Sequence, residues 1–220
     1  MRKCLNCNLK LHSKRQNAIY CSARCRVQGN RKRNTNVTDN SQKVILSLCD
    51  RSGIWCQPYK KHGYLVKQID LSICSTDIRL LNFPGLVYGI LAAPPCTVFA
   101  NSGNRWKRTE QELIDGLSVV DACLRLASIC KPHFWVLENP VGKLKHYLGD
   151  PTWYFNPCDY GDPWTKKTCL WGEFNKPKPS FVKPTLGSLA HKLSGLSEKN
   201  KGLRSLTPVG FAQAFFLANQ

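Results

Sequence analysis

Short apolar runs without polar alternation mark the strands that this sequence predicts. Leu86–Leu91 is followed, after two alanines, by two prolines and Cys96, and Phe134–Leu137 is followed by Glu138–Pro140. Such runs are typical of strands buried on both faces of a parallel sheet. Proline cannot donate to a sheet ladder, so the first strand is expected to end at the two prolines, and Glu138–Pro140 is expected to end the second after Leu137. Cys96 and Glu138 would then lie at the edge where open α/β sheets bind ligands.

Two further strands are predicted nearer the start of the chain, at Lys43–Cys49 and Tyr64–Ile69. The turn between them, Asp50–Trp55, contains small residues that let backbone N–H groups approach a ligand, and a helix opens at Gln57. Residues expected to bind the ligand in this turn are Asp50, Ser52, Gly53 and Trp55.

An acidic residue follows the second strand at the distance expected for a nucleoside site. Asp70 comes about twenty residues after the turn, where a carboxylate can accept both hydroxyls of a ribose. Together with the turn it indicates a nucleoside-bearing cofactor. Asp77 is a second candidate for the same pocket, although an ordinary turn or capping role fits it equally well.

The remaining periodic segments complete an alternation of strands and helices. Thr109–Glu112 is a capping box, and the apolar residues that follow at steps of three and four predict a crossover helix ending before Lys131. Residues 173–203 predict an irregular basic segment. Pro208 opens a final apolar helix. This order of elements predicts an α/β fold.

The first thirty residues contain four cysteines with the spacing of a zinc site. Cys4 and Cys7 are separated by two residues, and Cys21 and Cys25 by three. Each pair can hold one side of a tetrahedral ion, and four thiolates leave no open coordination position, so the zinc would be structural. A segment this short and polar needs such a metal to fold. Tyr20–Arg26 resembles small treble-clef zinc modules, in which a helix starts at the second pair.

The net charge of +18 is concentrated in the same part of the chain, because residues 1–43 hold eleven Lys or Arg against one Asp. A basic segment of this kind indicates a polyanionic partner, most plausibly nucleic acid. Five basic residues are expected to contact its phosphates: Arg24, Arg26, Arg31, Lys32 and Arg33. The expected organisation is a zinc module at 1–33, a polar linker at 34–42 and a second domain at 43–220.

The sequence contains twelve cysteines but no apolar leader behind Met1 and no run long enough to span a membrane. We therefore expect reduced thiols and a cytoplasmic protein of a bacterial or phage-infected cell. Nothing in the sequence indicates an oligomeric state.

The order of motifs resembles that of the cytosine-C5 DNA methyltransferases, specifically short phage-type members. The matching segments are Leu46–Gly53 for the cofactor turn, Asp70 for the ribose acid, Pro94–Cys96 for the nucleophile, Glu138–Pro140 for Glu-Asn-Val, Asp159–Gly161 with Pro163, and Arg204–Pro208 for Arg-x-Leu-Thr-Pro. Where the family has Gln-x-Arg-x-Arg, this chain has Lys166 and then Thr168 in the arginine places, with Lys167 between them. About thirty residues stand where full-size members carry a target-recognition domain.

This resemblance implies a Rossmann-like, S-adenosylmethionine-dependent methyltransferase sheet and transfer of a methyl group to C5 of cytosine in DNA. Cys96 would add to C6 of the base, Glu138 would relieve the charge on the ring, and Lys166 and Lys167 would hold base or phosphate. Pro94 would border the cofactor. Two alternatives stay open: an inactive DNA-binding protein with the same fold, and an enzyme that modifies cytidine nucleotides or RNA by the same thiol addition.

Overall fold

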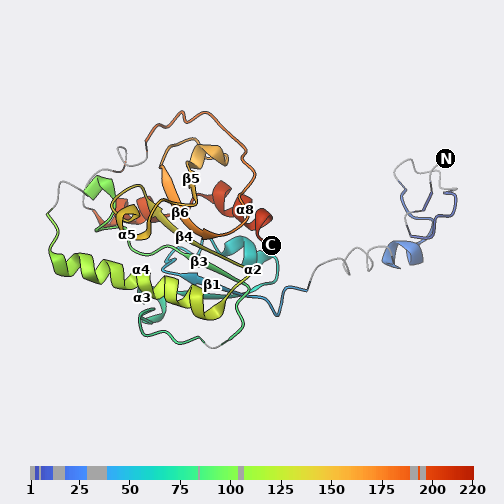
Figure 1. The fold of residues 1–220 in the computed structure, drawn as a ribbon. Coiled ribbons are helices and arrows are strands. Elements are labelled where there is room, and N and C mark those ends of the chain that lie inside the picture. Colours follow the sequence, from blue (N-terminus) through green and yellow to red (C-terminus); the bar gives the residue numbers. More distant parts are fainter. Residues whose placement is uncertain are drawn as a thin grey trace. The chain divides into compact units, whose positions relative to one another are not determined.

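The structure is a computed structural model. It describes residues 3–4, 6–11, 18–28, 39–83, 85–103, 107–188, 193 and 197–220. The chain divides into two compact units, Met1–Asp39 and Asn40–Gln220 (Figure 1). Most of the expected linker at 34–42 lies outside the described residues.

A six-stranded mixed sheet forms the second unit, in the order β2-β1-β3-β4-β6-β5. Its strands are β1 (Val44–Leu48), β2 (Leu65–Ile69), β3 (Gly89–Ala92), β4 (Phe134–Pro140), β5 (Trp153–Phe155) and β6 (Thr168–Glu173). β1 to β4 are parallel to one another, and β6 is antiparallel to both β4 and β5. The predicted α/β fold class is confirmed.

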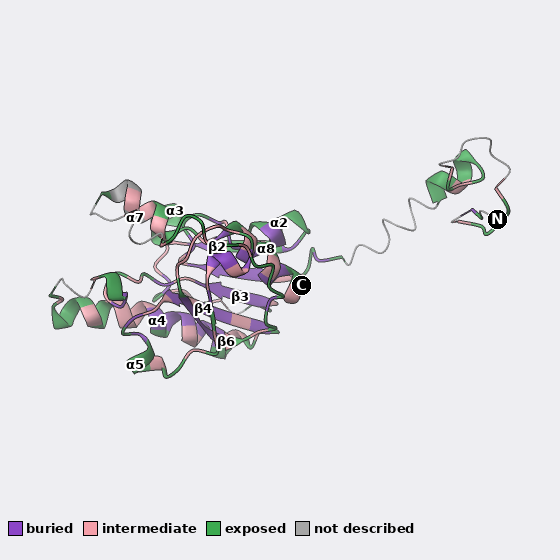
Figure 2. Cartoon of the chain, turned by 90° about the horizontal axis from the view of Figure 1, so that it is seen from above, coloured by how far each residue is buried: buried purple, intermediate pink, exposed green. Residues whose placement is uncertain are grey.

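Helices pack on both faces of this sheet. The helices of this unit are α2 (Gln57–Lys61), α3 (Leu71–Cys74), α4 (Glu110–Cys130), α5 (Lys145–Leu148), α7 (Glu198–Ser205) and α8 (Val209–Ala218), and the 3-10 turns are η1 (Asn101–Gly103) and η2 (Pro157–Asp159). Residues of α4 fill one core cluster and residues of α2 and α8 fill the other, so the central strands are buried between them (Figure 2). No helix in the described ranges has the length and apolarity needed to cross a membrane.

The crossover helix is confirmed at both ends. The Thr109 side chain accepts the Glu112 N–H at 3.1 Å, and the Glu112 carboxylate accepts the Thr109 N–H at 2.8 Å, which completes the capping box. The helix stops at Lys131, whose φ of +44° ends the helical backbone.

Two strand boundaries differ from the prediction. β3 begins only at Gly89, so Leu86 lies outside the strand and is 93 % exposed. At Gly89 the backbone lies against the Phe134 ring, and a Cβ there would be 2.1 Å from that ring. The second predicted strand was expected to end before Glu138, but β4 continues to Pro140. The reason is β6, which pairs with β4 on the side away from β3 and extends the ladder as far as Pro140↔Thr168.

Several short elements were not predicted, among them α3, α5, α7 and β5. α7 lies within the segment expected to be irregular, and it begins at Ser197, whose side chain accepts the Asn200 N–H. β5 is three residues long and is held by β6. Strands this short give too little periodicity to detect.

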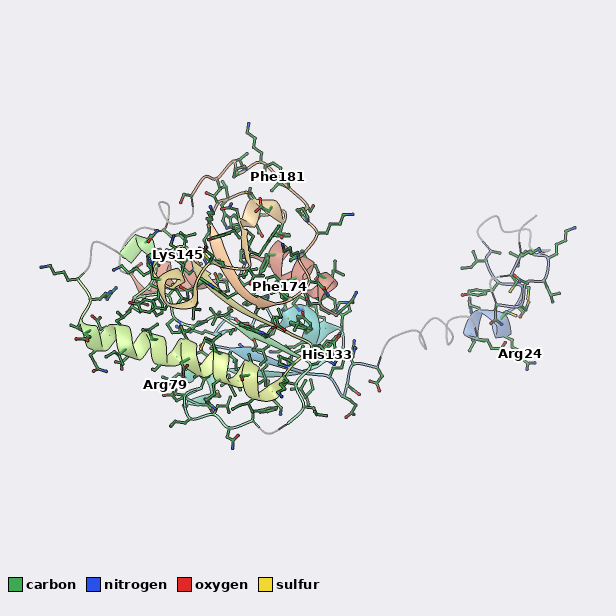
Figure 3. All side chains as sticks on the ribbon, viewed as in Figure 1. Arg24, Arg79, His133, Lys145, Phe174 and Phe181 are labelled. Carbon is green, nitrogen blue, oxygen red and sulfur yellow. The ribbon has the colours of Figure 1, made fainter. Side chains whose placement is uncertain are left out.

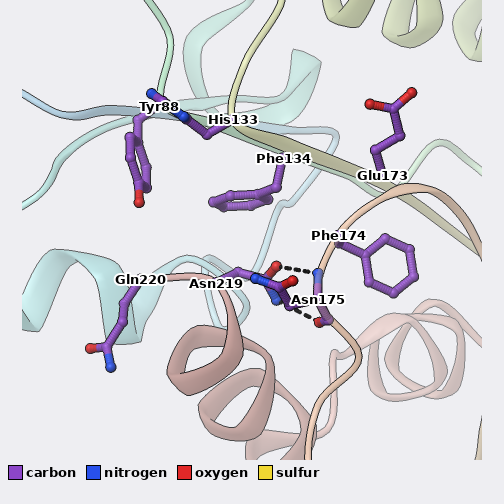
Figure 4. Close-up of a pocket in the computed structure, with 8 residues that line it drawn as sticks. All are labelled: Tyr88, His133, Phe134, Glu173, Phe174, Asn175, Asn219 and Gln220. Carbon is purple, nitrogen blue, oxygen red and sulfur yellow. Dashed lines mark hydrogen bonds between the residues drawn. The ribbon is translucent and has the colours of Figure 1, made fainter.

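The final helix closes the second core. Phe211, Ala212, Phe215 and Phe216 of α8 are buried against α2 and the sheet. Beyond it, the Asn219 side chain accepts the Asn175 N–H at 2.8 Å and donates to the Asn175 carbonyl at 3.0 Å (Figure 4). This pair lines a pocket of about 270 Å³ at the edge of the sheet where β3 and β4 begin.

Replacing Phe211 with alanine should destabilise the second unit strongly. The ring is fully buried and stacks on Phe155 at 3.8 Å between centroids, and a buried Phe→Ala change costs about 3–5 kcal/mol. Chemical denaturation should show this loss, while Leu217→Ala, on the 58 % exposed side of the same helix, should change the unfolding free energy by less than about 1 kcal/mol. Equal losses in the two variants would contradict the assigned core.

Candidate active site

The parallel strands place three chain segments side by side at one edge of the sheet. Leu48 of β1 is paired with Ala92 of β3, and Ala92 with Leu137 of β4. The segments that follow these residues contain the predicted turn, Cys96 and Glu138. β2 and β3 lie on opposite sides of β1, so the strand order reverses here, which is where open α/β sheets form a ligand crevice.

The turn after β1 is shaped by the carboxylate of Asp50. This buried group accepts hydrogen bonds from the Gly53 N–H at 2.8 Å and from the hydroxyls of Ser47 and Ser52 at 3.0 Å. Gly53 has a φ of +66°, and a Cβ there would lie 2.9 Å from the Gln68 side chain. Asp50 therefore organises the turn from within, and Ser52 remains exposed at its surface.

Trp55, expected to contact the cofactor, is fully buried. Its ring lies 5.9 Å from that of Phe211 and 5.7 Å from that of Phe215. In this structure its side chain joins the turn to α8.

The two predicted acids beyond β2 have different surroundings. Asp70 caps α3, where its Oδ1 accepts the Ser72 N–H at 2.9 Å and the Ser72 hydroxyl. Asp77 forms an ion pair with Arg79 through both carboxylate oxygens, and this pairing lowers the pKa of Asp77. Asp77 thus serves a local turn, the role that the sequence left open.

The loop after β3 is fastened to the end of β4. The side-chain amide of Asn139, which is fully buried, donates to the Pro94 carbonyl at 3.0 Å. The N–H groups of Phe99 and Ala100 both donate to the Cys96 carbonyl, at 3.0 and 2.9 Å, so the backbone turns tightly at the thiol. Asn139 was not predicted as a positioning residue, although its place next to Glu138 in a three-residue motif was a signal that could have identified it.

The chain after β4 passes very close to the same loop. A Cβ at Gly142 would lie 1.9 Å from the Phe99 carbonyl oxygen, and Lys143 N–H donates to that oxygen at 2.8 Å. Only glycine fits this contact. It holds the segments containing Cys96 and Glu138 at a fixed separation.

Cys96, Glu138 and Lys166 interact electrostatically. Burial raises the pKa of the Cys96 thiol, the Glu138 carboxylate raises it further, and the charges of Lys166 and Arg204 lower it. Burial also raises the pKa of Glu138, and Lys166 opposes that shift. The structure thus brings together a thiol, a carboxyl group and an amine from three elements. Arg204 belongs to the motif Arg-x-Leu-Thr-Pro but was not predicted to act on the thiol.

The two adjacent lysines before β6 are directed differently. The charge of Lys166 lowers the pKa of both Cys96 and Glu138. The Lys167 ammonium instead lies 5.0 Å above the Tyr154 ring on the sheet surface. Thr168 is buried and donates its hydroxyl to the Lys166 carbonyl at 2.7 Å. Thr168 therefore supports the backbone of Lys166, while Lys167 is separate from the thiol.

A pocket of about 350 Å³ opens beside Lys166. Its walls include Ile54, which follows Gly53 in the turn, and Trp164. Leu206–Pro208, between α7 and α8, and Val209 at the start of α8 form much of the remaining wall. The pocket thus joins the turn after β1 to the basic loop before β6. It is mostly apolar, and no local sequence pattern indicated it because its walls come from distant segments.

The first unit gathers its four cysteines. The sulfur atoms of Cys4, Cys7, Cys21 and Cys25 all lie within 4.8 Å of one another, with Cys7–Cys21 at 3.6 Å and Cys21–Cys25 at 3.5 Å. Zinc–sulfur bonds of about 2.3 Å place tetrahedral ligands about 3.8 Å apart, so the thiols fit zinc. None of the four is in a disulfide.

The helix expected at the second cysteine pair is present at residues 23–28. Ser22 caps it by accepting the Cys25 N–H at 3.1 Å. Arg24 and Arg26 are exposed on it (Figure 3 labels Arg24), and the other three basic residues proposed to bind phosphate, Arg31, Lys32 and Arg33, lie outside the described residues.

Neither a family model nor a curated protein matches the chain. Among the solved structures that match is a candidate DNA modification methyltransferase encoded within a prophage of E. coli, with 18% sequence identity and a TM-score of 0.44. The match covers 71% of this chain and 56% of the other, so the chain spans little more than half the length of that protein. A likeness at this level does not decide function, which has to be argued from the site itself.

The purified protein should contain one zinc ion per chain. Cys21→Ser should lower the bound zinc at least tenfold, because a tetrahedral site loses one of its four thiolates. Elemental analysis after dialysis measures this. Cys74→Ser is the matched control, since Cys74 is also exposed but lies outside the cluster. Loss of zinc in both variants, or in neither, would contradict the site.

Proposed function

We propose that this chain is a DNA (cytosine-5)-methyltransferase that transfers a methyl group from S-adenosylmethionine to cytosine through a covalent adduct with Cys96. The observation that carries the proposal is the convergence of the segments that contain Cys96, Glu138 and Lys166 at the carboxyl edge of the sheet. β4 pairs with β3 and with the start of β6 there, and Asn139 donates to the Pro94 carbonyl. The charges of Glu138 and Lys166 act in opposite directions on the pKa of Cys96. The resemblance of motif order stated above supports the choice of cytosine.

The residues around β1 and β2 fit the cofactor. The left-handed Gly53 and the exposed Ser52 form a turn that a ligand can approach. Asp70 follows β2 directly, and within the described part of the chain both hydrogen bonds to its carboxylate end on Oδ1, which leaves Oδ2 for a ribose hydroxyl. When bound there, S-adenosylmethionine supplies an electrophilic methyl group on a sulfonium centre.

Cytosine C5 is a weak nucleophile, and Cys96 would change that. The thiolate forms a bond to C6, and the electron pair displaced from the C5–C6 double bond makes C5 nucleophilic. After C5 has gained the methyl group, loss of its proton restores the double bond and expels the thiolate. Because a base within a duplex is out of reach, the target has to leave the stack.

Glu138 and Lys166 would control charge during this addition. The raised pKa of Glu138 keeps this group protonated to higher pH than an ordinary carboxylic acid, so it can donate a hydrogen bond to N3 of the base. The Lys166 ammonium favours the thiolate of Cys96, since it lowers the pKa of the thiol.

The decisive experiment measures transfer of labelled methyl from S-adenosylmethionine to duplex DNA. Label should appear at C5 of cytosine and should fall at least 10³-fold in Cys96→Ser, because a serine hydroxyl is a far weaker nucleophile than a thiolate. Cys74→Ser, an exposed cysteine on α3, is the control. Transfer that persists in Cys96→Ser would refute the nucleophile, and no transfer to DNA despite DNA binding would favour an inactive binding protein.

The pH dependence of transfer should report the charge of Lys166. The reactive form is the thiolate, so the rate rises with pH through the raised pKa of Cys96. Lys166→Gln removes a charge that lowers this pKa, so the rising limb should move to higher pH, with kcat reduced about 10²-fold near neutrality. Lys166→Arg restores a positive charge and should return the limb toward its original position. An unshifted limb in Lys166→Gln would show that Lys166 does not act on the thiol.

A further inference from the structure

Lys167 lies on a surface that the proposed chemistry does not use. Side chains alternate across a strand, and Cys169 belongs to the core cluster on the α4 side of the sheet, whereas its neighbour Leu170 belongs to the α8 side. Tyr154 of β5 is paired with Cys169, and the Lys167 ammonium lies 5.0 Å above its ring. Lys167 and Tyr154 therefore share the α4 side of the sheet.

Lys145 of α5 lies on the same side of the sheet. Leu148 of this helix packs against the core cluster that contains Cys169, and the ring N–H of Trp171 in β6 donates to the Gly149 carbonyl, directly after α5, at 3.0 Å. Burial raises the pKa of the Cys169 thiol to about 11, the Glu138 carboxylate adds to the shift, and the charges of Lys167 and Lys145 oppose it. Both lysines thus lie near one buried thiol although they come from different segments. Lys145 and Lys167 are exposed, and Tyr154 is 40 % exposed. The exposed carboxylate of Asp150 also raises the pKa of Tyr154.

This surface is fastened to the loop that contains the nucleophile. The Val141 N–H donates to the Lys167 carbonyl at 3.4 Å, and two residues later the Lys143 N–H donates to the Phe99 carbonyl at 2.8 Å. One short segment, 141–143, therefore joins the lysine before β6 to the turn that follows Cys96. α5 begins directly after this segment, so Lys145 lies at the same end of the sheet as the site, opposite His133 (Figure 3).

We propose that Lys145, Tyr154 and Lys167, the α5–β5 surface, dock the phosphate backbone of duplex DNA next to the target base. Exposed ammonium groups at a fixed separation bind phosphates without reading sequence. The tyrosine holds one of them in place through its ring face. The choice of DNA rests on the proposed function, whereas the charge and position of the surface do not.

The test is equilibrium binding of a fluorescent 20-base-pair duplex to the full chain at several salt concentrations. Each phosphate contact contributes about 0.9 to the slope of log affinity against log salt. Lys145→Gln with Lys167→Gln should therefore reduce the slope by about 2 and weaken binding about tenfold or more at 0.1 M salt. Lys61→Gln, an exposed lysine at the far end of α2, is the matched control. Thermal unfolding checks that all variants fold.

The outcomes separate this proposal from the proposed function. A weakened, less salt-dependent double variant supports the surface even where no methyl is transferred. An unchanged slope, an equal loss in Lys61→Gln, or no binding of DNA by the parent chain overturns it. A loss seen only with an RNA duplex of the same sequence also overturns it, because the partner would then be RNA. Affinity for S-adenosylmethionine should be the same in the double variant and the parent chain.

Discussion

The register of the parallel ladder β1–β3–β4 is the constraint on which the site depends. Leu48, Ala92 and Leu137 lie in one row across the sheet, and each is followed within a few residues by a group that the chemistry needs. A slip of one residue would send the side chains of a strand to the opposite face. The large apolar residues on both faces make such a slip costly, so core packing also fixes the relative positions of the turn, the thiol and the carboxyl group.

Beyond the ends of the strands, where ladder hydrogen bonds stop, a side-chain hydrogen bond and a close backbone contact hold the segments together. Asn139 fastens the proline loop to β4, and Gly142 allows the chain to pass directly against Phe99. Neither contact reaches the reacting atoms, yet each limits how far Cys96 can move relative to Glu138. Because reactive groups must be held to within a fraction of an ångström, such supports matter as much to catalysis as the residues they position.

The sequence predicted what depends on local pattern. Buried strands, the capping box of α4 and the four-cysteine spacing each follow from residues close together in the chain, and all of these features are present in the structure. The burial of Trp55 did not follow, because the rings of Phe211 and Phe215 that enclose it come from the end of the chain. The exposure of Leu86 depends on where the pairing of β3 with β4 begins, and the length of β4 depends on its pairing with β6. Likewise, the two adjacent lysines look equivalent in sequence, and only the structure shows that they are directed differently.

The position of α8 has a consequence for how the protein is made. Its phenylalanines complete the core on one side of the sheet, so while the ribosome is still adding residues before 209 the second unit has an open apolar face. All four residues of the four-cysteine cluster, in contrast, are synthesised before any residue of the second unit. We therefore expect the four-cysteine module to form on the nascent chain first, while the second unit stays incomplete and exposed to chaperones until α8 emerges.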